Sequence, residues 1–161
     1  MTDLADAVAA GSAAAVMDAL GELACAVTGA RLVTVMVFDP DDGSAGREWT
    51  NMPDAYPVSG RKPMNTTHWS EQVFGRHETF VANTLAEVAA VFDDHPLIAS
   101  LGCESCMNLP IVIGGQVMGT INCLDAAGYW TAERLSTARA LRLPGAATLM
   151  FHRMLTKELQ A

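Results

Sequence analysis

Basic residues, cysteines and long apolar runs are all scarce in this sequence. It has 10 lysines and arginines against 18 aspartates and glutamates, for a formal net charge of −8. Because non-specific nucleic-acid binding depends on Lys and Arg neutralising phosphates, this balance argues against nucleic acid as a partner. No apolar run approaches the roughly 20 residues that span a bilayer, so we also expect no membrane insertion.

The first residues and the cysteines bear on the compartment. The chain starts M-T-D-L-A-D-A-V, with acids where a secretory signal peptide would carry positive charge. Four cysteines are too few for a disulfide scaffold in a chain of 161 residues, and they are most simply interpreted as reduced thiols. We therefore expect a cytoplasmic protein.

Length and composition together predict one folded domain. Half of the residues are apolar and 17% are charged, which argues against disorder. A chain of 161 residues has the size of one domain with a single core. We predict a single domain over residues 1–161, standing alone, with no kinase, cyclase or DNA-binding segment attached.

Hydrophobic periodicity predicts a helix near each end of the chain. Ser12 is the expected N-cap and Gly29 the expected terminator of a helix over residues 12–27, after a shorter helix over 2–10. Thr131 should begin the last helix, which Pro144-Gly145 should kink or split before it continues over 146–159. The expected elements between them are strands over 31–38, 47–52 and 78–82, a loop over 53–63, and short helices over 69–74, 84–91 and 96–101.

Residues 105–131 predict a β-hairpin followed by a helix. Two β-prone runs flank Gly114-Gly115, a pair typical of tight hairpin turns. A two-residue turn would set Cys106 opposite Cys123, whereas a three-residue loop with a bulged glycine would set Cys106 opposite Asn122. Both registers stay open. Consecutive antiparallel strands framed by terminal helices predict the α+β class.

The hairpin carries a resemblance to a known family. The run from Asn108 to Leu124, N-L-P-I-V-I-G-G-Q-V-M-G-T-I-N-C-L, followed by Y-W-T-A-E, resembles the C-terminal signature of GAF domains. The resemblance implies an antiparallel sheet of five or six strands, with the N- and C-terminal helices on one face. Short helices and loops, here residues 56–101, would cover a pocket on the other face. It also implies a sensory, signal-transducing module that binds a small molecule.

One enzymatic branch of that family, the free methionine-(R)-sulfoxide reductases, differs from this sequence at its functional positions. The branch would place acids where Cys106, Asn122 and Leu124 stand, and a cysteine where Ala99 stands. The missing carboxylates would remove the ammonium-binding charge and the proton donor that the reduction needs. We therefore expect a non-catalytic module whose ligand is unknown, although enzymatic activity stays open.

The predicted pocket combines apolar walls with a few fixed polar groups, as a small-molecule site requires. An amide inside an apolar strand must find hydrogen-bond partners or cost about 1–3 kcal/mol, so Asn108 and Asn122 stand out. The residues expected to bind the ligand are Asn51, Trp69, Phe80, Asn83, Ser105, Cys106, Asn108 and Asn122. The largest basic cluster, Arg61-Lys62, would either attract an anionic ligand or be ordinary surface.

The alternative hypothesis is a thiol-based redox sensor or reductase that uses Cys103 and Cys106. The same C-x-x-C spacing could be half of a zinc site, but the sequence offers no second such pair. We found neither the Cys-His pair of bilin-binding relatives nor a cyclic-nucleotide motif, and we expect no metal and no cofactor.

The terminal helices also suggest an assembly. Their small side chains permit close helix approach, so we expect a homodimer through these helices, although a close-packed monomer would use the same alanines. The alanines concerned are Ala13, Ala14, Ala15, Ala19, Ala24, Ala146 and Ala147.

Overall fold

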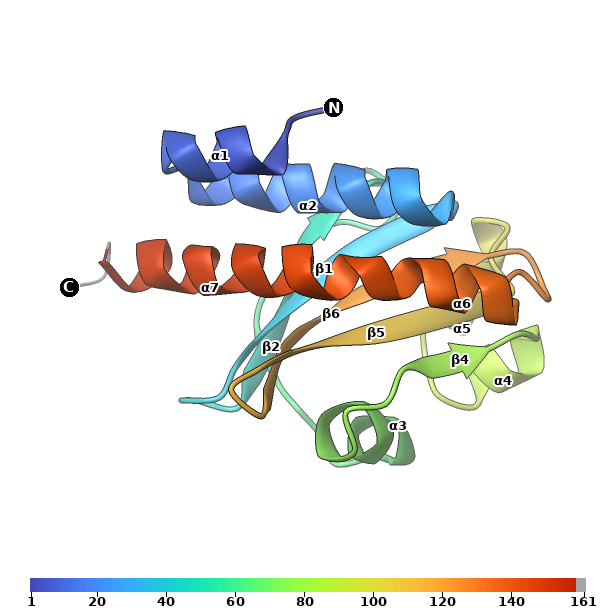
Figure 1. Cartoon of the computed structure of the whole chain (residues 1–161). Helices are drawn as coiled ribbons and strands as arrows, with labels where there is room; N and C mark the ends of the chain where they lie inside the picture. The colour runs from blue at the N-terminus through green and yellow to red at the C-terminus, as the bar shows by residue number, and fades with distance from the viewer. Residues whose placement is uncertain (159–161) are drawn as a thin grey trace.

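Six strands form one antiparallel sheet in the order β3-β2-β1-β6-β5-β4 in the computed structural model, which describes residues 1–158 (Figure 1). The strands are β1 (Leu32–Asp39), β2 (Ser44–Thr50), β3 (Lys62–Pro63), β4 (Phe80–Ala82), β5 (Ser105–Ile113) and β6 (Gln116–Asp125). The two longest, β5 and β6, pair with each other, and β6 lies beside β1 at the centre of the sheet. The predicted α+β class with an antiparallel sheet is confirmed.

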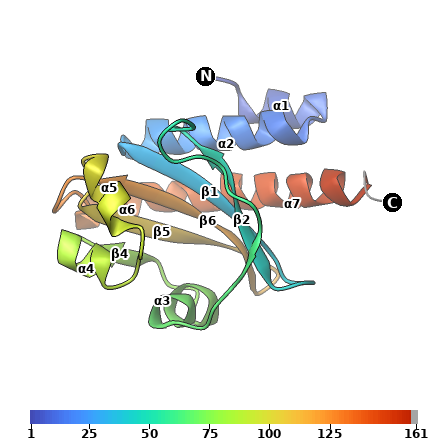
Figure 2. The same cartoon turned by 180° about the vertical axis from the view of Figure 1, so that it is seen from behind.

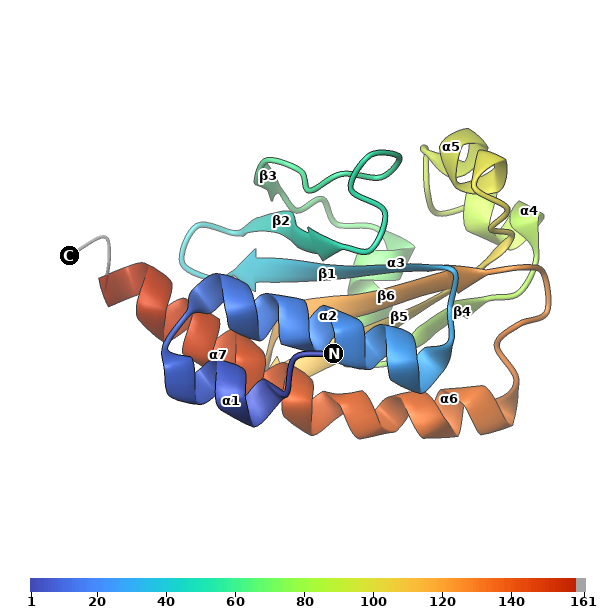
Figure 3. The same cartoon turned by 90° about the horizontal axis from the view of Figure 1, so that it is seen from above.

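The terminal helices cover one face of this sheet, as Figure 3 shows from above. The helices on the sheet are α2 (Ala13–Thr28), α6 (Ala132–Ala138) and α7 (Arg142–Glu158), and α1 (Leu4–Ala10) packs on the outer side of α2 and α7. The Ser12 hydroxyl accepts a hydrogen bond from the amide of Ala15, and Gly29 ends α2 in the left-handed conformation, as the sequence predicted. Among residues 1–158, no helix combines the length and the apolar character needed to cross a bilayer.

Short helices and loops cover the opposite face, which Figure 2 brings to the front. They are α3 (His68–Ser70), the π-helical turn η1 (Glu71–Gly75), α4 (Leu85–Ala89) and α5 (His95–Ser100). Thr84 begins α4 with the predicted capping box, because its side chain accepts from Glu87 while the Glu87 carboxylate accepts from the backbone of Thr84. The sheet thus separates two apolar clusters, one under each cover.

The last helical segment breaks earlier than the sequence predicted. A turn of 3-10 helix, η2 (Arg139–Leu141), separates α6 from α7. Pro144 lies in the first turn of α7, where a missing N–H costs no intrahelical hydrogen bond, so it does not split that helix. The end of the predicted helix, residue 159, lies outside the described residues.

The hairpin register differs from both predicted alternatives. The turn has two residues, with Gly114 and Gly115 at φ 59° and 81°, but Met118 forms a β-bulge on β6. The extra residue moves every later pair by one position, so that Cys106 faces Leu124 and Asn108 faces Asn122. Next to the bulge, a Cβ atom on Gly119 would lie 2.3 Å from the carbonyl oxygen of Met36, so the close approach of β1 requires glycine there.

A second bulge changes the side on which β2 presents its side chains. Val35 pairs with Trp49, but Met36 pairs with Arg47, which leaves Glu48 as the extra residue. Since alternate residues of a strand point to opposite faces, this insertion places Arg47 on the same face as Met36. That face is the one under the short helices.

Candidate functional site

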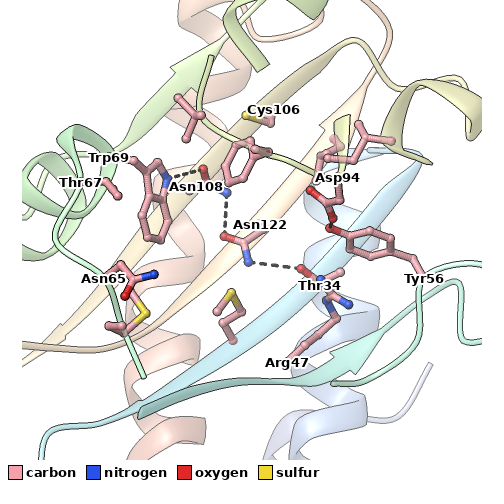
Figure 4. Close-up of a pocket in the computed structure, with 16 residues that line it drawn as sticks. Thr34, Arg47, Tyr56, Asn65, Thr67, Trp69, Asp94, Cys106, Asn108 and Asn122 are labelled. Carbon is pink, nitrogen blue, oxygen red and sulfur yellow. Dashed lines mark hydrogen bonds between the residues drawn. The ribbon is translucent and has the colours of Figure 1, made fainter. Parts of the chain in front are cut away.

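A cavity of about 320 Å³ lies between the sheet and its cover of short helices and loops (Figure 4). Its floor comes from β1, β2, β5 and β6, and its walls come from the loop after β2 and from α3, α5 and their neighbours. The lining residues are Thr34, Met36, Arg47, Tyr56, Met64, Asn65, Thr67, Trp69, Val91, Phe92, Asp94, Ile98, Cys106, Asn108, Asn122 and Leu124.

A chain of side-chain hydrogen bonds crosses the floor of the cavity. Trp69 Nε1 donates to Asn108 Oδ1 at 2.9 Å, and Asn108 Nδ2 donates to Asn122 Oδ1 at 2.8 Å. Asn122 Nδ2 then donates to Thr34 Oγ1 at 3.2 Å, and Figure 4 shows the three bonds one after another. We call these four residues the amide relay. Asn108, Asn122 and Thr34 lie opposite one another on β5, β6 and β1, and the Met118 bulge sets the β5–β6 register that aligns the two asparagines.

The relay leaves polar groups available at the cavity. Each carboxamide nitrogen carries two N–H groups and gives only one of them to the relay. The Thr34 hydroxyl accepts within the relay, and its own proton has no partner among the hydrogen bonds of the described residues. The part of the floor that the amide relay forms is therefore neutral, ordered and rich in donors.

Aromatic side chains hold Trp69 in place above this floor. Its ring packs edge to face with those of Phe74 and Phe92, at centroid separations of 5.8 and 6.2 Å. Thr67 caps the short helix that carries Trp69, in a capping box with Ser70. One end of the relay is thus anchored outside the sheet.

Arg47, Tyr56 and Asp94 form a second polar group in the lining. The Arg47 guanidinium lies over the Tyr56 ring, with Cζ 3.8 Å from the centroid, and the Tyr56 hydroxyl donates to Asp94 Oδ2 at 2.5 Å. Burial, and then the neighbouring Asp94 carboxylate, raise the pKa of Tyr56 above its ordinary value. Tyr56 therefore stays protonated and acts as a hydrogen-bond donor.

Of the eight residues expected to bind a ligand, four line the cavity. Trp69, Asn108 and Asn122 belong to the amide relay, and Cys106 lies farther along β5. Cys106, Asn108 and Asn122 come together because β5 and β6 place alternate residues on one face, and Trp69 reaches the same face from α3.

The other four expected residues do not line the cavity. Asn51 accepts from the amide of Val33 and donates to the carbonyl of Arg31. Asn83 and Ser105 also bind backbone, Asn83 at residue 130 and Ser105 at residues 125 and 126, and Phe80 packs against Phe92 behind the wall. These polar groups are satisfied by the backbone, so they serve the fold at these positions.

Sequence reasoning missed Thr34, Arg47, Tyr56, Asn65 and Asp94. Arg47 reaches the cavity through the Glu48 bulge, which no residue pattern marks. The basic pair selected from sequence lies elsewhere, since Arg61 pairs with Glu48 at 3.2 Å and neither it nor Lys62 lines the cavity.

The cysteines are all free thiols, and burial makes them poor nucleophiles. Burial raises the pKa of Cys103 to about 11 and the pKa of Cys106 to about 12. Cys123 lies on the opposite face of the sheet from Cys106, in the cluster under the terminal helices. Across residues 1–158, no group of three or more His, Cys, Asp or Glu side chains is arranged to hold a metal ion.

Comparison with known proteins decides the family. The family model of the GAF domain matches residues 10–143. The chain belongs to the GAF domain family. GAF domains are sensory modules that bind small molecules, so a small-molecule partner is the general expectation for a chain of this family. No curated protein sequence matches this one significantly.

Solved structures of GAF domains have the same fold. The GAF domain of a two-component sensor histidine kinase from Bacillus halodurans has a TM-score of 0.67 at 11% identity, covering 86% of this chain and 93% of that one. The GAF domain/HD domain protein from Geobacter sulfurreducens has a TM-score of 0.69 at 9% identity, covering 96% of this chain and 99% of that one. The chromophore-binding domain of a bacteriophytochrome from R. palustris reaches 0.67 at 12% identity, over 98% of this chain and 60% of that one. At these identities the likeness is one of fold.

The thiol environment yields a testable prediction. At pH 8, Cys103 and Cys106 should react with Ellman's reagent at least roughly a hundredfold more slowly than free cysteine, because burial disfavours the thiolate. The Cys25→Ala variant removes the half-buried thiol, and unfolding in urea should abolish the protection. A thiol at position 103 or 106 that reacts as fast as free cysteine would restore the redox hypothesis.

Proposed function

We propose that this GAF domain binds a small organic molecule in the cavity above the amide relay and acts as a non-catalytic sensory module. The relay is the observation that carries the proposal. Two buried carboxamides in the centre of a sheet lower the stability of the fold unless they are hydrogen-bonded. Here they bond to each other, and their remaining N–H groups lie beside an open cavity. Apolar walls with a few fixed polar groups are the usual composition of a ligand site.

The size of the cavity supports a small ligand. Its volume of about 320 Å³ lies at the lower end of the range of about 300–1,000 Å³ that ligand pockets occupy. Trp69 and Phe92 offer flat apolar surface, and the amide relay offers donors. A compact molecule with an apolar body and one or two polar groups matches this lining.

The ionisable groups of the lining support a non-catalytic role. Cys106 is kept protonated by burial, which raises its pKa to about 12. Tyr56 and Asp94 are engaged with each other. A nucleophile needs an adjacent base within hydrogen-bond reach, and the described contacts give Cys106 none.

The four free thiols also support a reducing compartment, and we propose on that ground that the protein is cytoplasmic.

A thermal-shift screen tests ligand binding. Among nucleotides, amino acids, sugars and small organic acids, at least one class should raise the melting temperature, since a ligand at one hundred times its Kd adds about 2.7 kcal/mol of stability. Asn122→Ala and Asn83→Ala should each cost about 1–3 kcal/mol, because each leaves hydrogen-bond partners unpaired.

Only the Asn122→Ala variant should lose the ligand-induced shift, because Asn83 binds backbone away from the cavity. An equal loss in both variants would place the ligand elsewhere. Native mass spectrometry of freshly purified protein would show a ligand that the cavity retains.

We also propose a homodimer, formed through α7. Leu143, Met150 and Met154 are 78%, 58% and 49% exposed, and their spacing of seven and four residues puts them along one side of the helix. Such spacing is typical of helix-to-helix contacts, and a second copy would offer the same apolar stripe. Ala19 and Ala24, expected at the interface, are buried inside the monomer instead.

Light scattering on a gel-filtration column tests the dimer. The wild type should have twice the mass of one chain. The Met150→Glu variant should have the mass of a single chain, because a dimer would bury the new charge in its apolar interface. Val58→Glu is the matched control, since Val58 is also 58% exposed but lies in the loop after β2. A wild type that is monomeric at all concentrations would contradict the dimer.

A further inference from the structure

Arg47 is a feature of the cavity that small-molecule binding in general leaves unexplained. Among the described residues of the lining, Arg47 is the one cation and Asp94 the one acid. The ion pairs of residues 1–158 use Arg61, Arg76, Arg153 and Lys157, and none includes Arg47. Asp94 accepts from Tyr56 and forms none of these ion pairs, so Arg47 has no carboxylate partner in the described chain.

One edge of the Arg47 guanidinium is occupied and the other lacks acceptors. Nη1 donates to the carbonyl oxygen of Pro57 at 2.7 Å, and the Tyr56 ring covers one plane of the group. Nε is buried without a hydrogen-bond partner in the described structure, and Nη2 donates none of the hydrogen bonds found there. Because a buried charged donor is costly to leave unpaired, an acceptor from outside the chain would relieve this arrangement.

The unoccupied edge has a specific chemical counterpart. Nε and Nη2 of an arginine point the same way, at a spacing that matches the two oxygens of a carboxylate. Arg47 pairs with Met36, two residues along β1 from Thr34, so Arg47 and Thr34 belong to the same face of the sheet and both line the cavity. In Figure 4, Trp69 lies across the cavity from Arg47. An acid held at this edge would thus have the Thr34 hydroxyl next to it and the indole ring of Trp69 opposite.

Resting on the proposed function, we propose that the cavity selects a small monocarboxylate with an apolar or aromatic body. Its two oxygens accept from Nε and Nη2 of Arg47, with the Thr34 hydroxyl as a further donor. Its body lies against Trp69 and Phe92, whose rings are 6.2 Å apart and edge to face.

The charge of the surroundings favours a monoanion over a polyanion. A single arginine faces the ligand, and Asp94 in the same lining repels a second negative charge. The protein as a whole has a net charge of −8, which disfavours nucleotides and other polyphosphates further. The small volume of the cavity also favours a compact monoanion over a nucleotide.

The test compares acids with their neutral amides. Phenylacetate, indole-3-acetate and 4-methylpentanoate, each beside its primary amide, are titrated into the wild type by isothermal calorimetry. At least one acid should bind, and its amide should bind about ten- to a hundredfold more weakly, because charge-assisted hydrogen bonds are lost. Arg47→Gln should weaken binding of the acid by a similar factor, and Arg47→Lys should weaken it by less. Arg76→Gln should leave the affinity unchanged, since Arg76 is exposed and paired with Glu78.

The outcomes separate this inference from the proposed function. Amides that bind as well as their acids, or an Arg47→Gln variant that keeps full affinity, would overturn the carboxylate assignment while leaving the cavity as a ligand site. If none of the acids binds, the carboxylate assignment is overturned as well. The thermal-shift screen would then be the test of whether the cavity binds a ligand of another class. The melting temperatures of the unliganded variants show whether each one is folded.

Discussion

The hydrogen bond between Asn108 and Asn122 is the contact on which the rest of the site depends. It joins two carboxamides across the centre of the sheet, where an unpaired amide would cost about 1–3 kcal/mol. Because each amide can satisfy the other only when the two residues are directly opposite, the bond also favours one register of β5 against β6. The same pair fixes one end on Trp69 and the other on Thr34, and so ties the cover of the cavity to its floor.

Two β-bulges create this arrangement. Met118 on β6 aligns the asparagines, and Glu48 on β2 turns Arg47 to the same face. Bulges are common near functional sites because they re-aim a side chain without altering the rest of a sheet. Here both lie in strands that flank β1, so the neutral donors and the single cation of the lining converge on one cavity.

The sequence carries the outline of the fold in local signals. Ser12, Gly29, Thr84 and Thr131 mark helix ends through caps whose hydrogen bonds are short in range, and Gly114-Gly115 marks the turn through its positive φ angles. The bulges have no such signal, because they depend on how β1 approaches Gly119 and on packing between layers. The predicted registers were therefore both wrong by one residue or more.

The same limit applies to the site. Asn51 and Asn83 are as polar as Asn108 and Asn122, and only the tertiary structure reveals that the first two bind backbone. Arg47 could not be distinguished from a solvated strand residue, since its direction depends on the Glu48 bulge. Apolar and polar composition thus predicted that a pocket exists, while strand register decided which residues line it.

If the amide relay is the floor of a ligand site, its carboxamide groups should respond directly to a bound ligand. The most direct measurement is the two-dimensional ¹H–¹⁵N spectrum of the asparagine side chains, assigned by single Asn→Asp variants. It is recorded with and without the compound that most raises the melting temperature. The carboxamide signals of Asn108 and Asn122 should move on binding, while those of Asn51 and Asn83 should stay in place. Movement of the second pair alone, with the relay unchanged, would contradict this expectation.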